Sequence, residues 1–210
     1  MKKTIDPLKE FQQKLVDFAA KKRRGIRNPF VIVPVDPPYE QRMTEILSAW
    51  DPAVGNYGID SDGKTIPVKR IYLDQVLPQT EVYRTVVSIP QTALEAAVNA
   101  RQNGNVTEYV EETMRDNLAS EVVRVILDEH PDIREVERQI VLLLNLGSLY
   151  PFARASELLD EFDRHRAQST IGIPFPGSVI GGKLAFFGED ARHYYPAHRI
   201  DQQIKRGHLQ

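Results

Sequence analysis

The sequence contains no cysteine among its 210 residues. Disulfide bonds, thiolate nucleophiles and cysteine-ligated zinc sites are therefore excluded, because each needs a sulfur atom that this chain lacks. Long apolar runs are also missing, and the run at residues 140–144 is far shorter than the roughly 20 residues of a transmembrane helix. The first residues, MKKTIDPLKEFQQKL, contain no apolar segment of the signal-peptide type. We therefore expect a soluble cytoplasmic protein with no membrane partner.

Charge of one sign is not in excess, since 27 Lys and Arg face 29 Asp and Glu and the formal net charge is −2. A chain so close to neutrality has no overall field that would draw it onto nucleic acid. Local candidates for phosphate contacts are the basic run at residues 21–27, KKRRGIR, and the smaller cluster of Lys205 and Arg206. A solvated helix end explains the run more simply, because cations suit the carboxyl end of a helix. Direct DNA contact is therefore the weaker alternative.

Several catalytic and ligand-binding motifs are absent from the sequence. It contains neither G-x-x-x-x-G-K-[ST] nor G-x-G-x-x-G, and neither H-E-x-x-H nor G-x-S-x-G. The five histidines are scattered, and His193 and His198 are separated by a proline, so they cannot share a helix face. The segment IDSDG at residues 59–63 lacks the third acidic position and the closing glutamate of a calcium loop. We expect no metal, no cofactor and no enzymatic activity.

Strand-like and helix-like segments alternate along the chain. Asp6 and Pro7 are typical of a helix start, and apolar residues then recur at helical spacing up to Phe18. Strands are predicted at 29–35, 66–76, 139–145, 169–177 and 183–188, and helices after Asp36 and at 92–102, 105–130 and 151–166. The alternation predicts a single three-layer Rossmann-like α/β domain with a mostly parallel sheet of about five strands.

The composition also suggests three segments. Residues 1–28 are expected to form an N-terminal helix and a basic linker, and residues 29–200 the α/β domain. The polar residues 201–210 are expected to be a disordered tail. Within the domain, Pro34 interrupts the first strand and predicts that this strand ends early or bulges. Gly181 and Gly182 are typical of a hairpin between the last two predicted strands.

The stretch LLLNLGSLYPFAR, residues 142–154, joins a buried strand to a helix. It has one glycine and no following lysine, which disfavours a phosphate loop, and it lacks the second glycine of a serine-nucleophile turn. The simplest interpretation is that Gly147 permits the turn, Ser148 caps the helix and Pro151 lies in its first turn. An anion or partner contact at this helix start, with Arg154 as the nearest cation, is the alternative.

Two groups of residues are candidates for a functional surface. In open parallel sheets such surfaces gather at the carboxyl ends of the strands. That edge is expected to collect an interaction or anion site made of Asp36, Asn145, Gly147, Ser148, Arg154 and Gly177. The second candidate is an interface in RHYYPAHRI, residues 192–200, because Tyr194, Tyr195 and Arg199 are residue types enriched at binding hot spots. Plain packing of this segment is the alternative.

Four blocks of sequence resemble the signature blocks of one protein family in their order and spacing. They are GSLYPFARASELLDEF at 147–162, PFPG at 174–177, GKLAFFG at 182–188 and YYPAHRI at 194–200. The family is BrxB, the small protein of the BREX bacteriophage-exclusion systems of bacteria and archaea. FVIVPVDPPYE, residues 30–40, is similar to the family's first strand and proline-bearing turn, whereas part of the middle, 51–110, shows no clear similarity.

This resemblance implies a biological role more firmly than a chemical one. Family members are encoded beside a large ATPase, an alkaline-phosphatase-like PglZ protein and a PglX DNA adenine methyltransferase. These systems block phage replication and mark host DNA by methylation, and BrxB itself is not credited with a settled enzymatic activity. The resemblance therefore implies a non-catalytic adaptor that binds other BREX proteins, the PglZ-like protein first and PglX or the ATPase next. The alternatives are a nucleotide- or anion-binding regulatory subunit and a DNA-contacting accessory protein.

Overall fold

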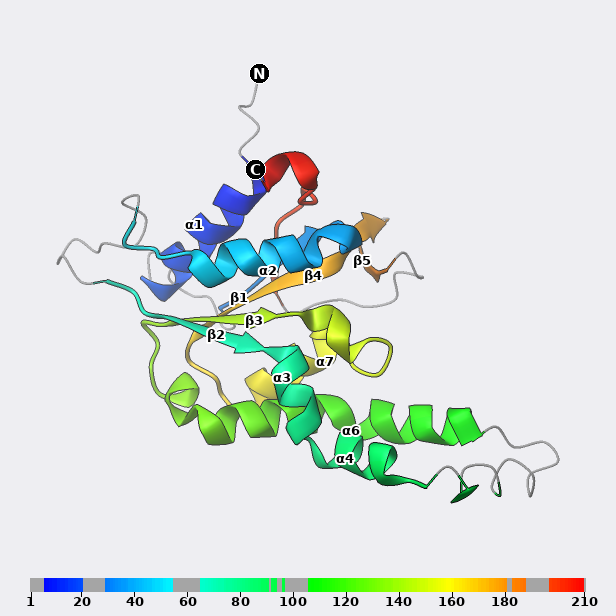
Figure 1. The fold of residues 1–210 in the computed structure, drawn as a ribbon. Coiled ribbons are helices and arrows are strands. Elements are labelled where there is room, and N and C mark those ends of the chain that lie inside the picture. Colours follow the sequence, from blue (N-terminus) through cyan, green and yellow to red (C-terminus); the bar gives the residue numbers. More distant parts are fainter. Residues whose placement is uncertain are drawn as a thin grey trace.

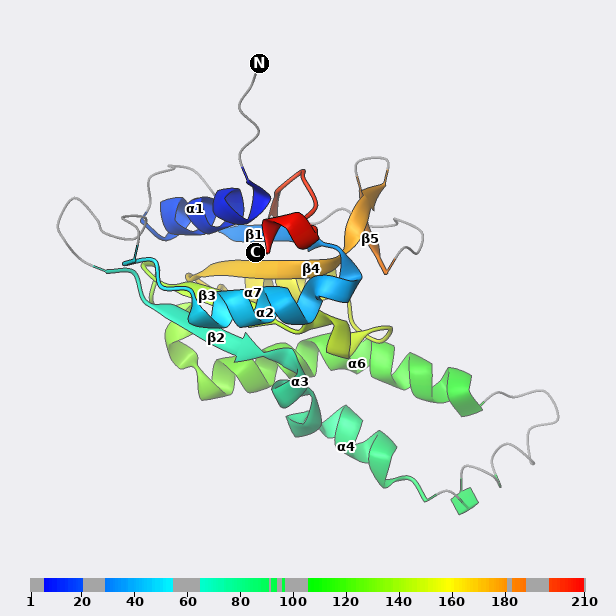
Figure 2. The same cartoon turned by 45° about the horizontal axis from the view of Figure 1, so that its top comes forward.

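The computed structural model describes residues 6–20, 29–54, 65–90, 92–93, 96, 106–180, 183–187 and 197–209. A central sheet lies between two layers of helices, as Figures 1 and 2 show. The predicted three-layer α/β fold with a mostly parallel sheet is therefore confirmed. In the described part of the chain, no helix combines the length and the apolar character that a membrane crossing requires.

The helices and strands follow the predicted alternation in outline. The strand predicted at 66–76 ends at residue 72, because residues 73–76 form a helix, and neither the helix at 81–88 nor the short strand at 198–199 was predicted. The strands are β1 (Phe30–Val35), β2 (Val68–Tyr72), β3 (Ile140–Leu144), β4 (Thr170–Ile180), β5 (Lys183–Phe186) and β6 (His198–Arg199). The α-helices are α1 (Pro7–Ala19), α2 (Glu40–Ala49), α3 (Leu73–Val76), α4 (Glu81–Ser88), α6 (Val106–Glu129) and α7 (Ala155–Arg164). Short 3-10 helices are η1 (Pro37–Tyr39), η2 (Leu77–Gln79), η3 (Pro131–Arg134), η4 (Leu146–Leu149) and η5 (Arg206–His208). The helix predicted at 92–102 falls largely outside the described residues.

The sheet has the strand order β2-β3-β4-β1-β6, and all of these neighbours pair in parallel. β1 and β3 are buried along their whole length, which is the pattern expected of strands covered on both faces. β5 pairs antiparallel with the end of β4, and Ile180 lies opposite Lys183. This register confirms the predicted hairpin. The carboxyl ends of the parallel strands point to the right in Figure 1, where β5 and the start of α2 also lie.

The expectation that Pro34 ends or distorts β1 is wrong, because β1 continues through Val35. The carbonyl of Pro34 accepts a hydrogen bond of 2.8 Å from the N–H of Ile204. In a parallel strand the nitrogen and carbonyl of one residue face the same neighbour, so the missing N–H of Pro34 faces the C-terminal segment. On that side β1 pairs with the two-residue β6 and forms a single bridge between Val35 and Ile204, so the ladder is short and tolerates a proline.

Two prolines in β4 shape the carboxyl edge of the sheet. The N–H of Thr170 donates to the carbonyl of Gln139, so the even-numbered residues of β4 face β3. Pro174 and Pro176 also face that side and have no N–H to donate. Pairing between β3 and β4 ends at Gly172, before the first of these prolines. The two strands therefore form no ladder pairs at their carboxyl ends, where η4 follows β3 after Asn145.

The helices pack on the two faces of the sheet by their apolar sides. α1 begins as predicted, because the Oδ1 atom of Asp6 accepts the N–H of Leu8 at 2.9 Å. α1 and α2 cover one face of the sheet, and α3, α4, α6 and α7 cover the other, as Figure 2 shows. Because α1 packs directly on β1, it belongs to the same core as the domain. The predicted boundary at residue 28 lies outside the described residues.

The expectation of a disordered C-terminal tail is wrong for residues 201–209. Ile204 is fully buried and forms a parallel bridge with Val35, and Leu209 is buried in the core on the α1 side. The polar composition of this segment concealed these two apolar anchors. The C-terminal segment thus extends the sheet beyond β6 and lies close to α1 in Figure 1.

Candidate functional site

The predicted residues at the carboxyl edge divide into two groups in the structure. Asn145, Gly147 and Ser148 lie together at the end of β3 and in η4. Three residues that the sequence interpretation missed, Glu40, Thr44 and Asp74, bond to this group and join it to α2 and α3. Asp36, Arg154 and Gly177 bond to other partners and are not part of this network.

Asn145 is the centre of the polar network. Its backbone is left-handed, with φ of 59°, a conformation that asparagine adopts more readily than most residues. Its side-chain Nδ2 donates to Oδ1 of Asp74 at 2.8 Å, and its Oδ1 accepts from the Thr44 hydroxyl at 2.7 Å. One amide thereby joins the ends of β2 and β3 to helix α2.

Gly147 contacts the carboxylate of Glu40. Its N–H donates to Oε1 of Glu40 at 2.8 Å, and a Cβ at this position would overlap Oε2 of the same carboxylate. The glycine is therefore required for this close approach. The prediction that Gly147 supplies the conformational freedom of the turn is wrong, because the residue with positive φ is Asn145.

The Glu40 carboxyl has an unfavourable electrostatic environment. Burial raises its pKa above the ordinary value of 4.5, and the nearby negative charge of Asp74 raises it further. The hydrogen bond from the Gly147 N–H acts in the opposite direction but does not outweigh burial. Among the described residues, no Lys or Arg side chain forms an ion pair with Glu40 or Asp74.

The prediction that Ser148 caps the following helix is wrong, because α7 begins only at Ala155. The Ser148 hydroxyl donates instead to the carbonyl of Asn145 at 2.8 Å. At the true helix start, the N–H of Arg154 donates to Oε2 of Glu157 at 2.8 Å, which is one half of a capping box. Pro151 follows a cis peptide bond and lies before the helix, so its predicted place in the first turn is also wrong.

Asp36 and Gly177 are held by the C-terminal segment. The N–H of Asp36 donates to the carbonyl of Ile204 at 2.9 Å, and the carbonyl of Gly177 accepts from Nε2 of Gln203 at 2.8 Å. A Cβ on Gly177 would overlap the backbone oxygen of Ala185, so this glycine is needed where β5 pairs with β4. Both contacts stabilise the fold at the end of β1 and β4.

An aromatic cluster lies beside the polar network. The ring of Tyr150 stacks on Phe186 with centroids 5.1 Å apart and meets Phe187 edge-on at 5.0 Å. Phe186 also contacts Phe175 of β4 edge-on at 5.0 Å. Phe186 is buried, whereas the side chain of Phe187 is 42% exposed. The sequence interpretation gave residues 183–188 as a strand and residues 182–188 as a family-like block, and it did not predict this aromatic cluster.

The second predicted interface is described only in part. Tyr194 and Tyr195 lie outside the described residues. Arg199, on β6, is half-buried and its Nη2 donates to Oδ1 of Asp201 at 3.0 Å. A local ion pair is therefore one role of this arginine.

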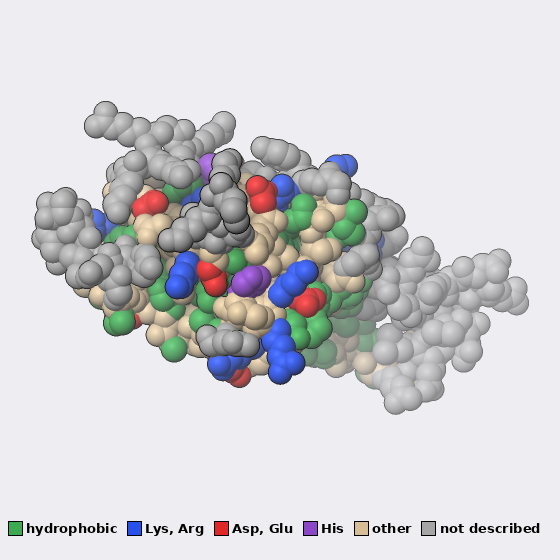
Figure 3. All heavy atoms as spheres, turned by 90° about the horizontal axis from the view of Figure 1, so that it is seen from above, with side chains coloured by type: hydrophobic (Ala, Val, Ile, Leu, Met, Phe, Trp, Pro, Cys, Tyr) green, Lys and Arg blue, Asp and Glu red, His purple; other side chains and the backbone are tan. Residues whose placement is uncertain are grey.

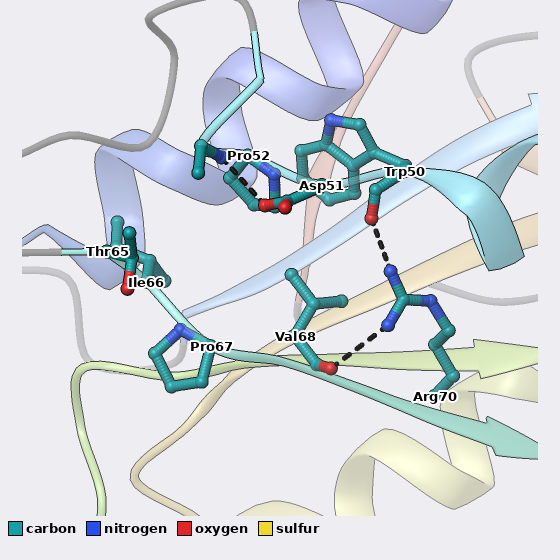
Figure 4. A pocket seen from close by; sticks show the side chains of 9 residues that line it. Trp50, Asp51, Pro52, Thr65, Ile66, Pro67, Val68 and Arg70 are labelled. Carbon is teal, nitrogen blue, oxygen red and sulfur yellow. Dashed lines mark hydrogen bonds between the residues drawn. The ribbon is translucent and has the colours of Figure 1, made fainter.

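A pocket of about 280 Å³ lies at the opposite, amino end of the sheet, between the end of α2 and the start of β2 (Figure 4). Its walls are formed by Trp50, Asp51, Pro52, Ala53, Thr65, Ile66, Pro67, Val68 and Arg70. Arg70 donates to the carbonyls of Leu47 and Val68 at 3.1 and 3.2 Å, and also to that of Trp50. The guanidinium thus joins the carbonyls at the end of α2 to the start of β2.

Charges of both signs are mixed on the face that carries α1 and the C-terminal segment, as Figure 3 shows. Lys205 and Arg206 are exposed in this segment. The basic run at residues 21–27 lies outside the described residues, so the structure adds nothing to the prediction of a DNA contact there. Within the part of the chain that the structure describes, no three His, Asp or Glu side chains are grouped closely enough to hold a metal ion.

Sequence signals exist for two of the three missed residues. Asp74 comes directly after β2, but the strand was predicted to continue to residue 76, which hid its position at the sheet edge. Glu40 lies at the start of α2, where an acidic residue suits the helix dipole, and it was not considered as a partner of η4. Thr44 gives no signal, because it lies inside a helix and its contact with Asn145 spans 101 positions.

The comparisons with known proteins identify one family. The family model described as BREX protein BrxB matches residues 79–200, which is more than half of the chain. The matched range contains the network residues Asn145 and Gly147 and the aromatic cluster, whereas Glu40 and Asp74 precede it. No curated protein and no solved structure matches the chain.

Proposed function

Since the chain belongs to the BrxB family, we propose that it is a non-catalytic adaptor of a BREX anti-phage complex. Membership of this family makes the chain a component of a BREX defence system. The adaptor role and the choice of partners are the proposed part. The observation that carries the proposal is the match of the BREX family model over residues 79–200. The PglZ-like protein is the first partner that we propose, followed by PglX and the ATPase.

The carboxyl edge of the sheet supports an adaptor rather than a nucleotide-binding subunit. An anion bound there would need free N–H groups and positive charge. The Gly147 N–H already donates to the chain's own carboxylate, Glu40, and Asp74 adds a second negative charge nearby. A phosphate group would have to displace Glu40 and would be repelled by Asp74.

The hydrogen bonds of the hydroxyl groups near the carboxyl edge support the non-catalytic part of the proposal. A serine nucleophile needs a base within hydrogen-bond reach. The Ser148 hydroxyl donates instead to the carbonyl of Asn145. Thr44 donates to an amide oxygen, and the Ser48 and Tyr72 hydroxyls bond to each other at 2.8 Å. These four hydroxyl groups are therefore engaged in bonds within the fold.

Co-purification tests the proposal. The tagged chain is expressed with the other products of its BREX operon and purified at near-physiological salt. The adaptor role predicts that at least one operon product is recovered with it in a fixed ratio. Recovery of the chain alone would contradict the adaptor role.

Nucleotide binding is tested separately by thermal unfolding of the isolated chain. A ligand present at about 100 times its dissociation constant stabilises a protein by roughly 2.7 kcal/mol, which shifts the melting temperature by several degrees. We expect no such shift with ATP, GTP or their diphosphates. A clear shift with any of them would favour the regulatory-subunit alternative.

A further inference from the structure

An exposed aromatic ring stands at the carboxyl edge of the sheet. Phe187 is 42% exposed, and it is the aromatic member of the exposed large apolar side chains in the described residues. The ring is held by neighbours, since Phe186 lies 4.9 Å and Tyr150 5.0 Å from it between centroids. A ring that is already fixed loses little conformational entropy on binding, which is why aromatic residues are frequent at the centres of interfaces.

Carboxylates adjoin this ring. A Cβ placed on Gly147 would lie 3.2 Å from Cζ of Phe187 and would also overlap Oε2 of Glu40. The Phe187 ring and the Glu40 carboxylate therefore both lie next to Gly147. Asp74 is exposed and is joined to the same edge through Asn145. The "acidic–aromatic surface" therefore consists of Glu40, Asp74, Tyr150 and Phe187. Within the described chain, its two carboxylates have no cationic partner.

We propose that the acidic–aromatic surface docks an arginine-bearing segment of a partner protein. The inference rests on the proposed adaptor role and names the chemistry of the partner's contact. A guanidinium group stacks on an aromatic face and pairs with carboxylates in the same plane, whereas an ammonium group does only part of this. Such a group would compensate the negative charges of Glu40 and Asp74 and would cover the exposed part of Phe187.

The same charges disfavour other occupants. A phosphate or nucleic-acid backbone would face two uncompensated carboxylates. A second copy of this chain, docked through the same surface about a two-fold axis, would bring identical carboxylates toward each other. A partner with a basic and apolar contact is the occupant whose chemistry matches both halves of the surface.

The test measures binding of the full chain to the PglZ-like protein of its operon. Two variants each change one half of the surface. Asp74→Lys reverses a negative charge, and Phe187→Ser removes the exposed aromatic ring. Their matched controls are Glu45→Lys on the exposed side of α2 and Ile180→Ser at the other end of the hairpin, both at exposed positions. We expect each test variant to raise the dissociation constant about tenfold or more, and each control to leave it within about twofold.

Asp74→Asn serves as a milder second charge variant, because its side-chain oxygen can still accept from Nδ2 of Asn145. We expect it to weaken binding in the same direction, and we expect added salt to weaken wild-type binding more than binding of this variant. Circular dichroism and thermal unfolding check that each variant is folded.

The outcomes separate the two proposals. If the wild-type chain binds the PglZ-like protein and the test variants bind it equally well, the docking inference is overturned and the adaptor role stands. Equal weakening by test and control variants would also overturn the inference, because it would show no preference for this surface. If the wild-type chain binds no operon product, the adaptor role fails and the inference fails with it.

Discussion

The two ends of the sheet differ in the space and in the charge that each of them presents. The amino end contains a pocket of about 280 Å³, but its arginine, Arg70, is bound to carbonyls of its own chain. At the carboxyl end, side chains of α2 and α3 bond to Asn145 and to the backbone of Gly147. Two carboxylates lie there without a cation among the described residues. The amino end of the sheet therefore has an open pocket. The carboxyl end has instead two carboxylates without a cationic partner in the described chain, beside the exposed ring of Phe187.

The largest effect is expected from Gly177→Ala at the carboxyl end. The new methyl group would overlap the backbone oxygen of Ala185, and backbone atoms cannot move aside as the end of a flexible side chain can. We expect a loss of about 3 kcal/mol in the free energy of unfolding, measured by denaturant titration. Ser178→Ala, at the next position of the strand, is the control and is expected to change little. An unchanged midpoint for Gly177→Ala would contradict the close approach of β5 to Gly177 of β4.

At the amino end, Arg70→Met tests whether the arginine stabilises the fold. The substitution keeps an unbranched apolar stem and removes the donors to the carbonyls of Leu47, Trp50 and Val68. We expect a loss of about 2 kcal/mol in the free energy of unfolding, because partly buried carbonyls lose their partners. Arg42→Met, on the exposed side of α2, is the control. Stability equal to the control's would contradict a stabilising role for the hydrogen bonds of Arg70.

Gly147→Ala tests the contact between η4 and α2. The methyl group would displace the Glu40 carboxylate from the Gly147 N–H, but the carboxylate is the flexible end of its side chain and can turn away. We expect a smaller loss than for Gly177→Ala, about 1 to 2 kcal/mol in the free energy of unfolding. Gly207→Ala is the matched control, since a Cβ there would meet no atom within 4 Å. Equal stability of the two variants would show that the Glu40 contact contributes nothing.

Glu40→Gln is expected to change the free energy of unfolding least. Its effect should appear as a change in how stability depends on pH. The pKa of Glu40 is raised in the folded protein, so the unfolded chain loses this proton at lower pH than the folded chain. Wild-type stability should therefore fall as the pH rises from about 4.5 through the raised pKa, relative to the variant, whose amide does not titrate. Thermal unfolding between pH 4 and 8 measures this difference. A difference of opposite sign would mean that the Glu40 charge is stabilised in the fold.

The sequence predicted the layers and strands well, because their signals are local. The buried apolar runs of β1 and β3 and the Asp6–Pro7 helix start depend on neighbouring residues alone. Pro34 and the C-terminal segment were misjudged for one shared reason. The tolerance of Pro34 depends on Ile204, which is 170 positions away in the chain and gives no local signal.

The candidate site was predicted only in part for a similar reason. Asn145, Gly147 and Ser148 could be found because they follow a recognisable strand end. Their partners could not, because Glu40 lies 107 positions from Gly147 and Asp74 lies 71 positions from Asn145. Ser148 was misassigned since the helix start that it was expected to cap lies seven residues further on, where Glu157 supplies the bond.

The most direct test of the adaptor role is the molar mass of the tagged chain after co-expression with the PglZ-like protein of its operon. Size-exclusion chromatography with light scattering at near-physiological salt gives this mass without labels. The proposed role predicts one peak that contains both proteins in a fixed ratio, and a shift to separate peaks when Asp74→Lys and Phe187→Ser are combined. Two separate peaks for the wild-type pair would contradict the PglZ-like protein as its partner, and separate elution from every other operon product as well would contradict the adaptor role itself.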